Sequence, residues 1–155
     1  MMMQLQTHTA QETRDFGEKL AKQLQGGDVL LLTGELGAGK SELARGIARG
    51  LGISGPVASP SFTILQVYDG GRLPLYHFDW YRLGSVNELY ELTMDEYLYD
   101  EGVSVVEWPA VAAEAVPEKH LDIVIDVTGE TDRRFTLTPA GGFRALNMDA
   151  LEARV

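Results

Sequence analysis

The most informative stretch of the sequence is Asp28-Val29-Leu30-Leu31-Leu32-Thr33-Gly34-Glu35-Leu36-Gly37-Ala38-Gly39-Lys40-Ser41. Residues 28–33 would be apolar on both faces of an extended chain, as expected of a strand buried in a parallel sheet. Residues 34–41 match the pattern G-x-x-x-x-G-K-[ST] in full. Residues 41–50 then show apolar side chains at helical spacing. The segment therefore predicts a strand, a glycine-rich phosphate-binding loop (P-loop) and a helix, in that order.

This P-loop is predicted to bind the phosphates of ATP together with Mg²⁺. Its glycines let backbone N–H groups converge on phosphate oxygens, and the following helix directs its positive end at the same anion. Lys40 is expected to reach the β- and γ-phosphates, and the Ser41 hydroxyl to ligate Mg²⁺. The glycine spacing is not G-x-G-x-x-G, which disfavours a dinucleotide-binding fold. The nucleotide-binding residues predicted within the motif are Leu36, Gly37, Ala38, Gly39, Lys40, Ser41 and Glu42.

Length and composition are those of an ordinary globular protein. The chain has 155 residues, 45% hydrophobic and 23% charged, and we expect a single domain over residues 1–155. The aliphatic run Val29–Leu32 is too short to span a bilayer and no leader pattern follows Met1, so we expect no membrane contact. The lack of Cys excludes disulfides, thiolate zinc sites and a Cys nucleophile, and it agrees with a cytoplasmic location.

The net charge of −10 is concentrated in the later part of the chain. Residues 1–50 carry six bases and six acids, whereas residues 51–155 carry seven bases and seventeen acids. Binding of duplex DNA or RNA over a broad basic face is therefore disfavoured for the chain alone. Residues 87–101 carry only acidic charges, which we interpret as a solvated helix face, with docking of a basic partner as the alternative.

Helix and strand patterns alternate early in the chain and hairpin patterns follow, which predicts an α/β fold, a three-layer α/β/α P-loop NTPase domain with a mixed central sheet. Thr9 and Glu12 fit a capping box at the start of a helix that ends at Gly26. Helical spacing predicts further helices across Val86–Leu98 and Pro109–Val116. The expected strands are Asp28–Thr33, a hairpin of Phe62–Tyr68 with Leu73–Asp79, Val103–Glu107, and a hairpin of Leu121–Val127 with Arg133–Thr138.

A P-loop needs an acidic side chain near its metal, at the end of a neighbouring strand. Glu107 ends one apolar run, and Asp126 lies at the end of another, where residues 126–129 spell the D-x-x-G of a GTPase switch. The chain contains no N-K-x-D for guanine recognition, and Asp126 lies in an expected terminal hairpin. We favour Glu107 on these grounds and keep Asp126 as the alternative.

The other dense polar cluster is His77-Phe78-Asp79-Trp80-Tyr81-Arg82. Asp79 is a candidate to orient the attacking water or to help hold the metal, and Arg82 to answer phosphate charge. A strand end with a structural Asp–Arg pair explains the same residues equally well. His77, taken alone, we interpret as structural.

Taken together, these pieces resemble the bacterial TsaE family, formerly YjeE. The resemblance extends from about Thr9 to Arg133. Beyond the P-loop, the three signatures that begin at Ser59, His77 and Glu107 are specific in combination. The matching residues are Gly34–Ser41, Arg45-Gly46, Arg49-Gly50-Leu51-Gly52, Ser59-Pro60-Ser61-Phe62-Thr63, His77-Phe78-Asp79-Trp80-Tyr81-Arg82-Leu83 and Glu107-Trp108-Pro109.

The resemblance implies a P-loop ATPase that works with the proteins TsaD and TsaB in tRNA threonylcarbamoyladenosine biosynthesis. In that family ATP binding and hydrolysis support turnover of the assembly that transfers a threonylcarbamoyl group to the adenosine beside the anticodon. This chain would not perform the transfer, and it would meet tRNA only through the complex. We expect a monomer alone, with slow hydrolysis until partners order its loops.

The resemblance also implies roles for single residues. Lys40 matches the phosphate-binding Lys, Ser41 and Glu107 match the Mg²⁺ ligands, and Asp79 matches an essential acid near the γ-phosphate, so that Lys40, Asp79 and Glu107 form the expected catalytic set. The segment Ser59–Thr63 matches a switch-like loop, and residues 10–13 and Arg133 match positions that border the nucleotide.

The chain also departs from the family pattern. Ser41 and Ser61 stand where Thr is usual, and Ala110 replaces an acid. Glu42 replaces a small hydroxyl residue after the P-loop, and we hypothesise that this acid weakens nucleotide affinity.

Two other functions compete with this interpretation. A small-molecule kinase would need an Arg-rich lid over the phosphates. Only Arg133 and Arg134 are adjacent among the bases after Gly50, which disfavours a kinase. A non-hydrolysing, nucleotide-gated binding module would keep its function in an Asp79→Asn variant.

Overall fold

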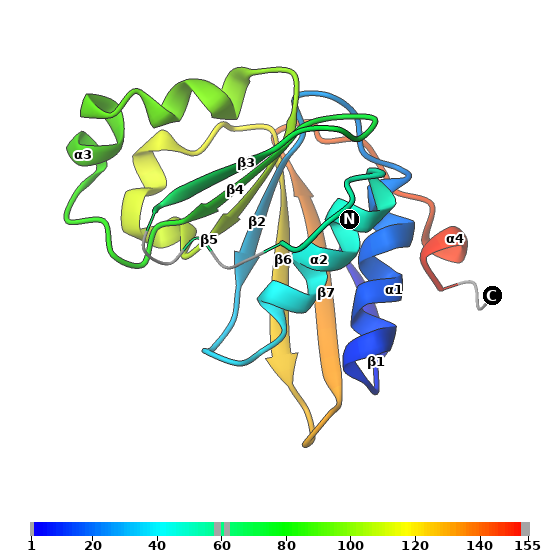
Figure 1. Ribbon diagram of the computed structural model, residues 1–155. Coiled ribbons are helices and arrows are strands. Elements are labelled where there is room, and N and C mark those ends of the chain that lie inside the picture. The colour runs from blue at the N-terminus through cyan, green and yellow to red at the C-terminus, as the bar shows by residue number, and fades with distance from the viewer. Residues whose placement is uncertain (1, 58–59, 61–62, 153–155) are drawn as a thin grey trace.

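A seven-stranded mixed sheet runs through the protein in the strand order β1-β7-β6-β2-β5-β4-β3 (Figure 1). The computed structural model describes residues 2–57, 60 and 63–152. The strands are β1 (Met3–Thr7), β2 (Val29–Thr33), β3 (Leu65–Tyr68), β4 (Leu75–Asp79), β5 (Val103–Glu107), β6 (His120–Val127) and β7 (Arg133–Ala140). The helices are α1 (Ala10–Ala21), α2 (Lys40–Gly50), α3 (Val86–Glu91) and α4 (Met148–Glu152), with 3₁₀ helices η1 (Met94–Tyr99) and η2 (Pro109–Ala115).

The four central strands are parallel, and this places the functional edge of the sheet. β2 pairs in parallel with β5 and β6, and β4 pairs in parallel with β5. Parallel strands end at one edge, and in open α/β sheets that edge binds ligands. The register sets Glu107 beside Leu32 on one side and beside Asp79 on the other. The P-loop, which follows β2, therefore begins at the same edge as these two carboxylates.

Helices cover both faces of this sheet, which confirms the predicted three-layer α/β/α arrangement. Alternate residues of β2 enter different cores: Leu30 and Leu32 pack with α1 and α2, whereas Val29 and Leu31 pack with the α3, η1 and η2 side. Figure 1 shows α1 and α2 on one side of the sheet and α3 on the other. A strand buried on both faces is apolar throughout, as the sequence of β2 is.

Three glycines let α1 and α2 pack at backbone distance. A Cβ built on Gly46 would lie 2.1 Å from the carbonyl oxygen of Arg14, and one on Gly17 would lie 2.7 Å from the carbonyl oxygen of Leu43. A Cβ on Gly50 would lie 2.6 Å from the carbonyl oxygen of Glu18. Larger residues at these positions would force the helices apart. The close packing fixes α1 beside the first turn of α2, which carries the P-loop lysine.

Several expected elements differ from those observed. The helix expected over Val86–Leu98 is divided into α3 and η1, because Thr93 adopts a left-handed φ of 54° between them. β3 begins at Leu65, after Ile64 with φ of 67°, while residue 62 of the strand predicted over 62–68 lies outside the described part. β1 and α4 were not predicted. The first bond of the capping box is confirmed, because Glu12 N–H donates to Thr9 Oγ1. The Glu12 side chain accepts the N–H of His8, the residue before the cap, instead of that of Thr9.

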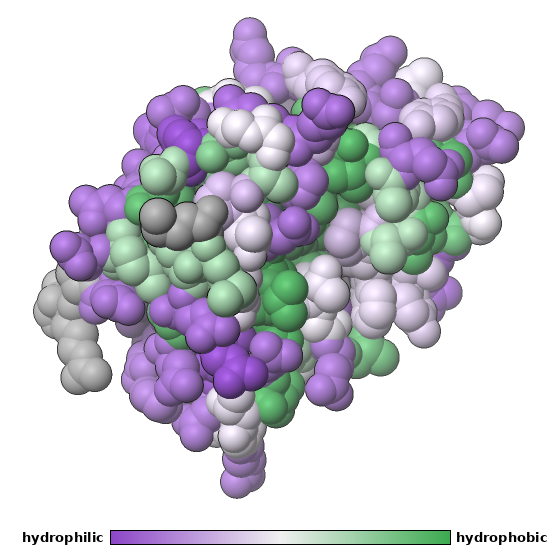
Figure 2. Space-filling model, turned by 180° about the vertical axis from the view of Figure 1, so that it is seen from behind, coloured by the Kyte–Doolittle hydropathy of each residue, from purple (hydrophilic) through white to green (hydrophobic). Residues whose placement is uncertain are grey.

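The surface behind the view of Figure 1 is of mixed polarity. Figure 2 shows hydrophilic side chains over much of this face, with hydrophobic side chains gathered in separate patches. Side chains of β6 alternate between buried and exposed positions. Leu121, Ile123 and Ile125 are buried, whereas Val124, between the last two, is exposed. Within the described residues, no helix has the length and apolar character needed to cross a bilayer.

Candidate functional site

The P-loop turns between β2 and α2 with two glycines in left-handed conformations. Gly37 has φ of 80° and Gly39 has φ of 109°, values that side chains rarely tolerate. Ala38 N–H donates to the carbonyl oxygen of Glu35 at 3.0 Å, which closes the turn. α2 begins at Lys40, so the first N–H groups of the helix lie at the end of the loop. These features are those of an anion-binding helix N-terminus.

A cavity of about 300 Å³ opens at this loop and gathers most of the predicted site. It lies where the P-loop meets the carboxyl ends of β4 and β5. The structure therefore brings together residues that are up to 72 positions apart in the sequence, from Leu36 to Trp108. Its lining residues are Leu36, Gly37, Gly39, Lys40, Ser41, Glu42, Asp79, Glu107 and Trp108.

Lys40 is a buried cation at the centre of this site. Its Nζ donates to the carbonyl oxygen of Gly34 at 2.7 Å and lies 3.9 Å from the centroid of the Trp108 ring. Burial lowers the pKa of Lys40 below its usual value, while the carboxylates of Glu107 and Asp79 act in the opposite direction and raise it. The sequence reasoning missed the Trp108 contact, although Trp108 directly follows Glu107 at the end of β5.

Asp79 and Glu107 stand side by side at the ends of two neighbouring strands. Their Cα atoms are register partners, and both side chains are buried, with exposed residue fractions of 6% and 4%. Asp79 Oδ1 accepts the N–H of Tyr81 at 3.0 Å. Glu107 Oε2 lies 2.6 Å from Nε2 of His77. The sequence interpretation of His77 as structural missed this contact, which the two-residue spacing from Asp79 on one strand face would have suggested.

The oxygen ligands present fit a P-loop magnesium site. The Ser41 hydroxyl and the Glu107 carboxylate line the same cavity. Among the residues that the structure describes, no group of three or more His, Cys, Asp or Glu side chains is placed to hold a metal. Mg²⁺ at a P-loop does not need such a group, because phosphate oxygens and water complete its six ligands. Ser41 and Glu107 are therefore the protein residues that would hold the ion.

Asp126, the alternative acid, lies elsewhere. Its carboxylate faces Arg134 on β7, with 3.5 Å between Oδ2 and the guanidinium, and it does not line the cavity. The side chain of Asp126 is also 46% exposed. Position thus favours Glu107 over Asp126 at the metal.

Arg133 and the start of α1 support the P-loop from the side of β7. Arg133 Nε donates to the carbonyl oxygen of Ala38 at 2.9 Å, and its Nη2 donates to that of Gly37 at 3.3 Å. Thr13 is buried, its hydroxyl lies 2.7 Å from that of Thr7, and its methyl group lies 4.0 Å from the position of a Cβ built on Gly39. Neither Arg133 nor Ala38 lines the cavity; Arg133 holds the P-loop through its hydrogen bonds to Ala38 and Gly37.

The switch-like loop predicted over Ser59–Thr63 lies largely outside the described residues. Residues 59, 61 and 62 belong to that undescribed part. Of the described residues in this stretch, Thr63 N–H donates to the carbonyl oxygen of Pro60 at 3.1 Å.

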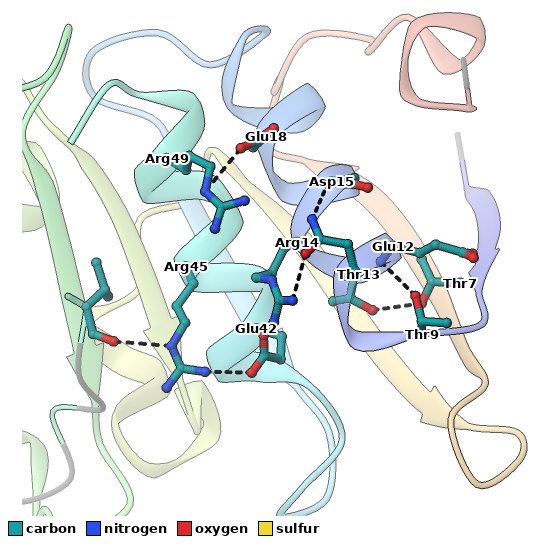
Figure 3. Close-up of polar contacts among 12 residues, drawn as sticks. Thr7, Thr9, Glu12, Thr13, Arg14, Asp15, Glu18, Glu42, Arg45 and Arg49 are labelled. Atoms are coloured by element: carbon teal, nitrogen blue, oxygen red, sulfur yellow. Dashed lines mark hydrogen bonds and ion pairs between the residues drawn. The ribbon is translucent and has the colours of Figure 1, made fainter. Parts of the chain in front are cut away.

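Glu42 is held between two arginines (Figure 3). Arg14 Nη1 lies 2.5 Å from Glu42 Oε2, and Arg45 Nη1 lies 2.6 Å from Glu42 Oε1. Each carboxylate oxygen therefore has its own cation, one from α1 and one from the next turn of α2. This pairing opposes the hypothesis that Glu42 presents an uncompensated negative charge to the phosphates.

We expect Glu42→Thr to leave ATP affinity within about twofold, because the arginines already balance the charge that the substitution removes. The same change lowers the free energy of unfolding by about 1 kcal/mol, since Arg14 and Arg45 lose their shared partner. Titration calorimetry with ATP and thermal unfolding measure the two effects. Affinity that rises tenfold or more in the variant would show that the carboxylate repels the phosphates after all.

Comparison with known proteins places this geometry in a family. The model of the family described as "Threonylcarbamoyl adenosine biosynthesis protein TsaE" matches residues 7–135. The protein is 43% identical over 142 residues to the tRNA threonylcarbamoyladenosine biosynthesis protein TsaE of Bacillus subtilis, covering 90% of this chain and 89% of that one. It is 38% identical over 135 residues to the Treponema pallidum protein of the same name, covering 87% and 99%.

A solved structure agrees with these sequence matches. The crystal structure of Bacillus subtilis YdiB superposes with a TM-score of 0.78 at 39% identity, covering 91% of this chain and 87% of that one. The fold, the span of the family match and the identities lead to one conclusion: the chain belongs to the TsaE family.

Proposed function

We propose that the protein binds and hydrolyses ATP with Mg²⁺ in support of tRNA threonylcarbamoyladenosine biosynthesis, acting with TsaD and TsaB in the cytoplasm. The observation that carries the proposal is the cavity that unites Lys40, Ser41, Asp79 and Glu107 at the carboxyl edge of the sheet. The relatives, named as tRNA threonylcarbamoyladenosine biosynthesis proteins, support the pathway. The ATPase chemistry and the partners are the parts of the proposal that experiments must test.

Each residue of the cavity has a defined task in this proposal. The P-loop N–H groups and the Lys40 ammonium bind the phosphates and compensate their negative charge. Bound Mg²⁺ would neutralise further charge on the β- and γ-phosphates, with Ser41 and Glu107 as its protein ligands. The Asp79 carboxylate, whose Oδ1 accepts the Tyr81 N–H, orients the attacking water.

The test of this function is phosphate release from ATP, measured with and without TsaD and TsaB. We expect slow phosphate release by the protein alone. With TsaD and TsaB present, release should rise by at least about tenfold, because partners can complete a phosphoryl-transfer site. Phosphate release that is absent in both conditions would refute the ATPase. Release that partners do not change would leave the ATPase and refute the partnership, whereas transfer of phosphate to a metabolite would show a kinase.

A further inference from the structure

A buried imidazole contacts the carboxylate at the expected metal position. His77 lies in β4, flanked by Tyr76 and Phe78, with 1% of its residue surface exposed. Its Nε2 is 2.6 Å from Oε2 of Glu107, whose side chain is 5% exposed. The His77 imidazole and the Glu107 carboxylate are therefore buried together, although the two residues are 30 positions apart in the sequence.

The strand geometry explains how His77 reaches Glu107. His77 and Asp79 are two residues apart on β4 and so point to the same face of the sheet. Glu107 is the register partner of Asp79 on β5, and His77 is paired with Val105. The histidine therefore lies two residues before Asp79 along β4, on the same face of the sheet as the two carboxylates. It does not line the cavity itself.

The second ring nitrogen argues against a purely packing role. His77 Nδ1 is buried and has no hydrogen-bond partner among the described residues. Burying a polar atom without a partner is unfavourable, and an apolar side chain such as that of Phe78 would avoid this penalty at the same depth. The contact with Glu107 is a polar interaction that an apolar residue at this position could not make.

We propose that His77 is a positioning residue for the metal ligand Glu107. An ionised carboxylate only accepts hydrogen bonds, so Nε2 carries the hydrogen and donates it to Oε2. This bond fixes the carboxylate in one orientation and leaves Oε1 as the atom available to Mg²⁺. Groups behind a metal ligand commonly orient it in this way and raise metal affinity. The inference rests on the proposed Mg²⁺–ATP function and adds His77 to it.

The test is the Mg²⁺ dependence of nucleotide binding, measured by calorimetry with the non-hydrolysable analogue AMP-PNP in excess Mg²⁺ and in EDTA. Asn places its amide near the position of Nδ1 and cannot reach Glu107, whereas Gln places its amide near Nε2. We expect His77→Asn to reduce the Mg²⁺-dependent gain in affinity by about tenfold. Binding in EDTA stays within about twofold of wild type, and His77→Gln restores most of the gain.

A double-mutant cycle separates positioning from general damage to the fold. In a Glu107→Ala background, His77→Asn should produce no further loss of the Mg²⁺ effect, because the residue through which it acts is absent. If His77→Asn does not fold in thermal unfolding experiments, His77→Phe takes its place, since a ring of similar shape fills the same space. His77→Gln remains the variant that must keep the Mg²⁺ effect.

The outcomes distinguish this inference from the function on which it rests. If wild-type protein binds AMP-PNP equally well with Mg²⁺ and with EDTA, both proposals fall. If wild type shows the Mg²⁺ effect and His77→Asn or His77→Phe retains it in full, the role of His77 alone is refuted. Equal losses of affinity in Mg²⁺ and in EDTA would also refute it, because they would show a structural role.

Discussion

Asp79→Asn is expected to lower ATP hydrolysis by about 10²–10⁴-fold, the range found when a group that handles a proton is removed. Asn keeps the size of the side chain, and its oxygen still accepts the N–H of Tyr81 that Asp79 Oδ1 accepts at 3.0 Å. The variant therefore removes a charge from the cavity without removing the contact that holds the side chain. Phosphate release in the presence of TsaD and TsaB is the measurement.

The control for Asp79→Asn is its affinity for AMP-PNP, which should stay within about threefold of wild type because the P-loop binds the phosphates. Glu107→Ala should also abolish hydrolysis, through loss of the metal. Retained turnover in Asp79→Asn would refute the role assigned to Asp79. If the pathway in cells tolerated Asp79→Asn although hydrolysis was lost, the protein would act as a non-hydrolysing, nucleotide-gated module.

Lys40→Ala is expected to weaken ATP binding by about 10- to 100-fold. This is the loss expected when the charge-assisted hydrogen bonds of one side chain to phosphate are removed. The substitution removes a cation that interacts electrostatically with the buried carboxylates of Asp79 and Glu107, so repulsion of the phosphates by these carboxylates adds to the loss. Calorimetric titration with ATP and Mg²⁺ measures the effect. Lys22→Ala, which removes an exposed lysine just after α1, is the matched control and should bind normally.

Two observations would count against this role of Lys40. One is wild-type affinity in Lys40→Ala, which would place the phosphates away from the P-loop. The other is loss of binding together with loss of the folded state, which thermal unfolding of the same sample would reveal. We expect the fold to remain, because the polar and ring contacts of Lys40 are with the Gly34 carbonyl and Trp108, next to the cavity.

The elements that carry the site were predictable because local sequence determines them. β2 is apolar on both faces, and its position between two cores follows directly from that pattern. Gly37 and Gly39 of the P-loop have left-handed φ, which glycine tolerates. The choice of Glu107 over Asp126 also rested on local sequence, and it stays a prediction; Glu107 lines the same cavity as Ser41, and Asp126 does not.

The features that sequence reasoning missed depend on contacts between distant segments. β1 is a short edge strand that is stabilised by pairing with β7, about 130 residues later, and its five residues carry little pattern of their own. The break at Thr93 interrupts helical spacing that continues on both sides of it. His77 and Glu107 are 30 positions apart, and only the parallel pairing of β4 with β5 brings them together.

Anomalous diffraction from crystals grown with AMP-PNP and Mn²⁺ in place of Mg²⁺ tests the central claim most directly. We predict one manganese peak between the Ser41 hydroxyl and the Glu107 carboxylate, with the analogue's phosphates against the N–H groups of residues 37–41. A peak at Asp126, or phosphates and metal absent from the P-loop at saturating ligand, would contradict the account.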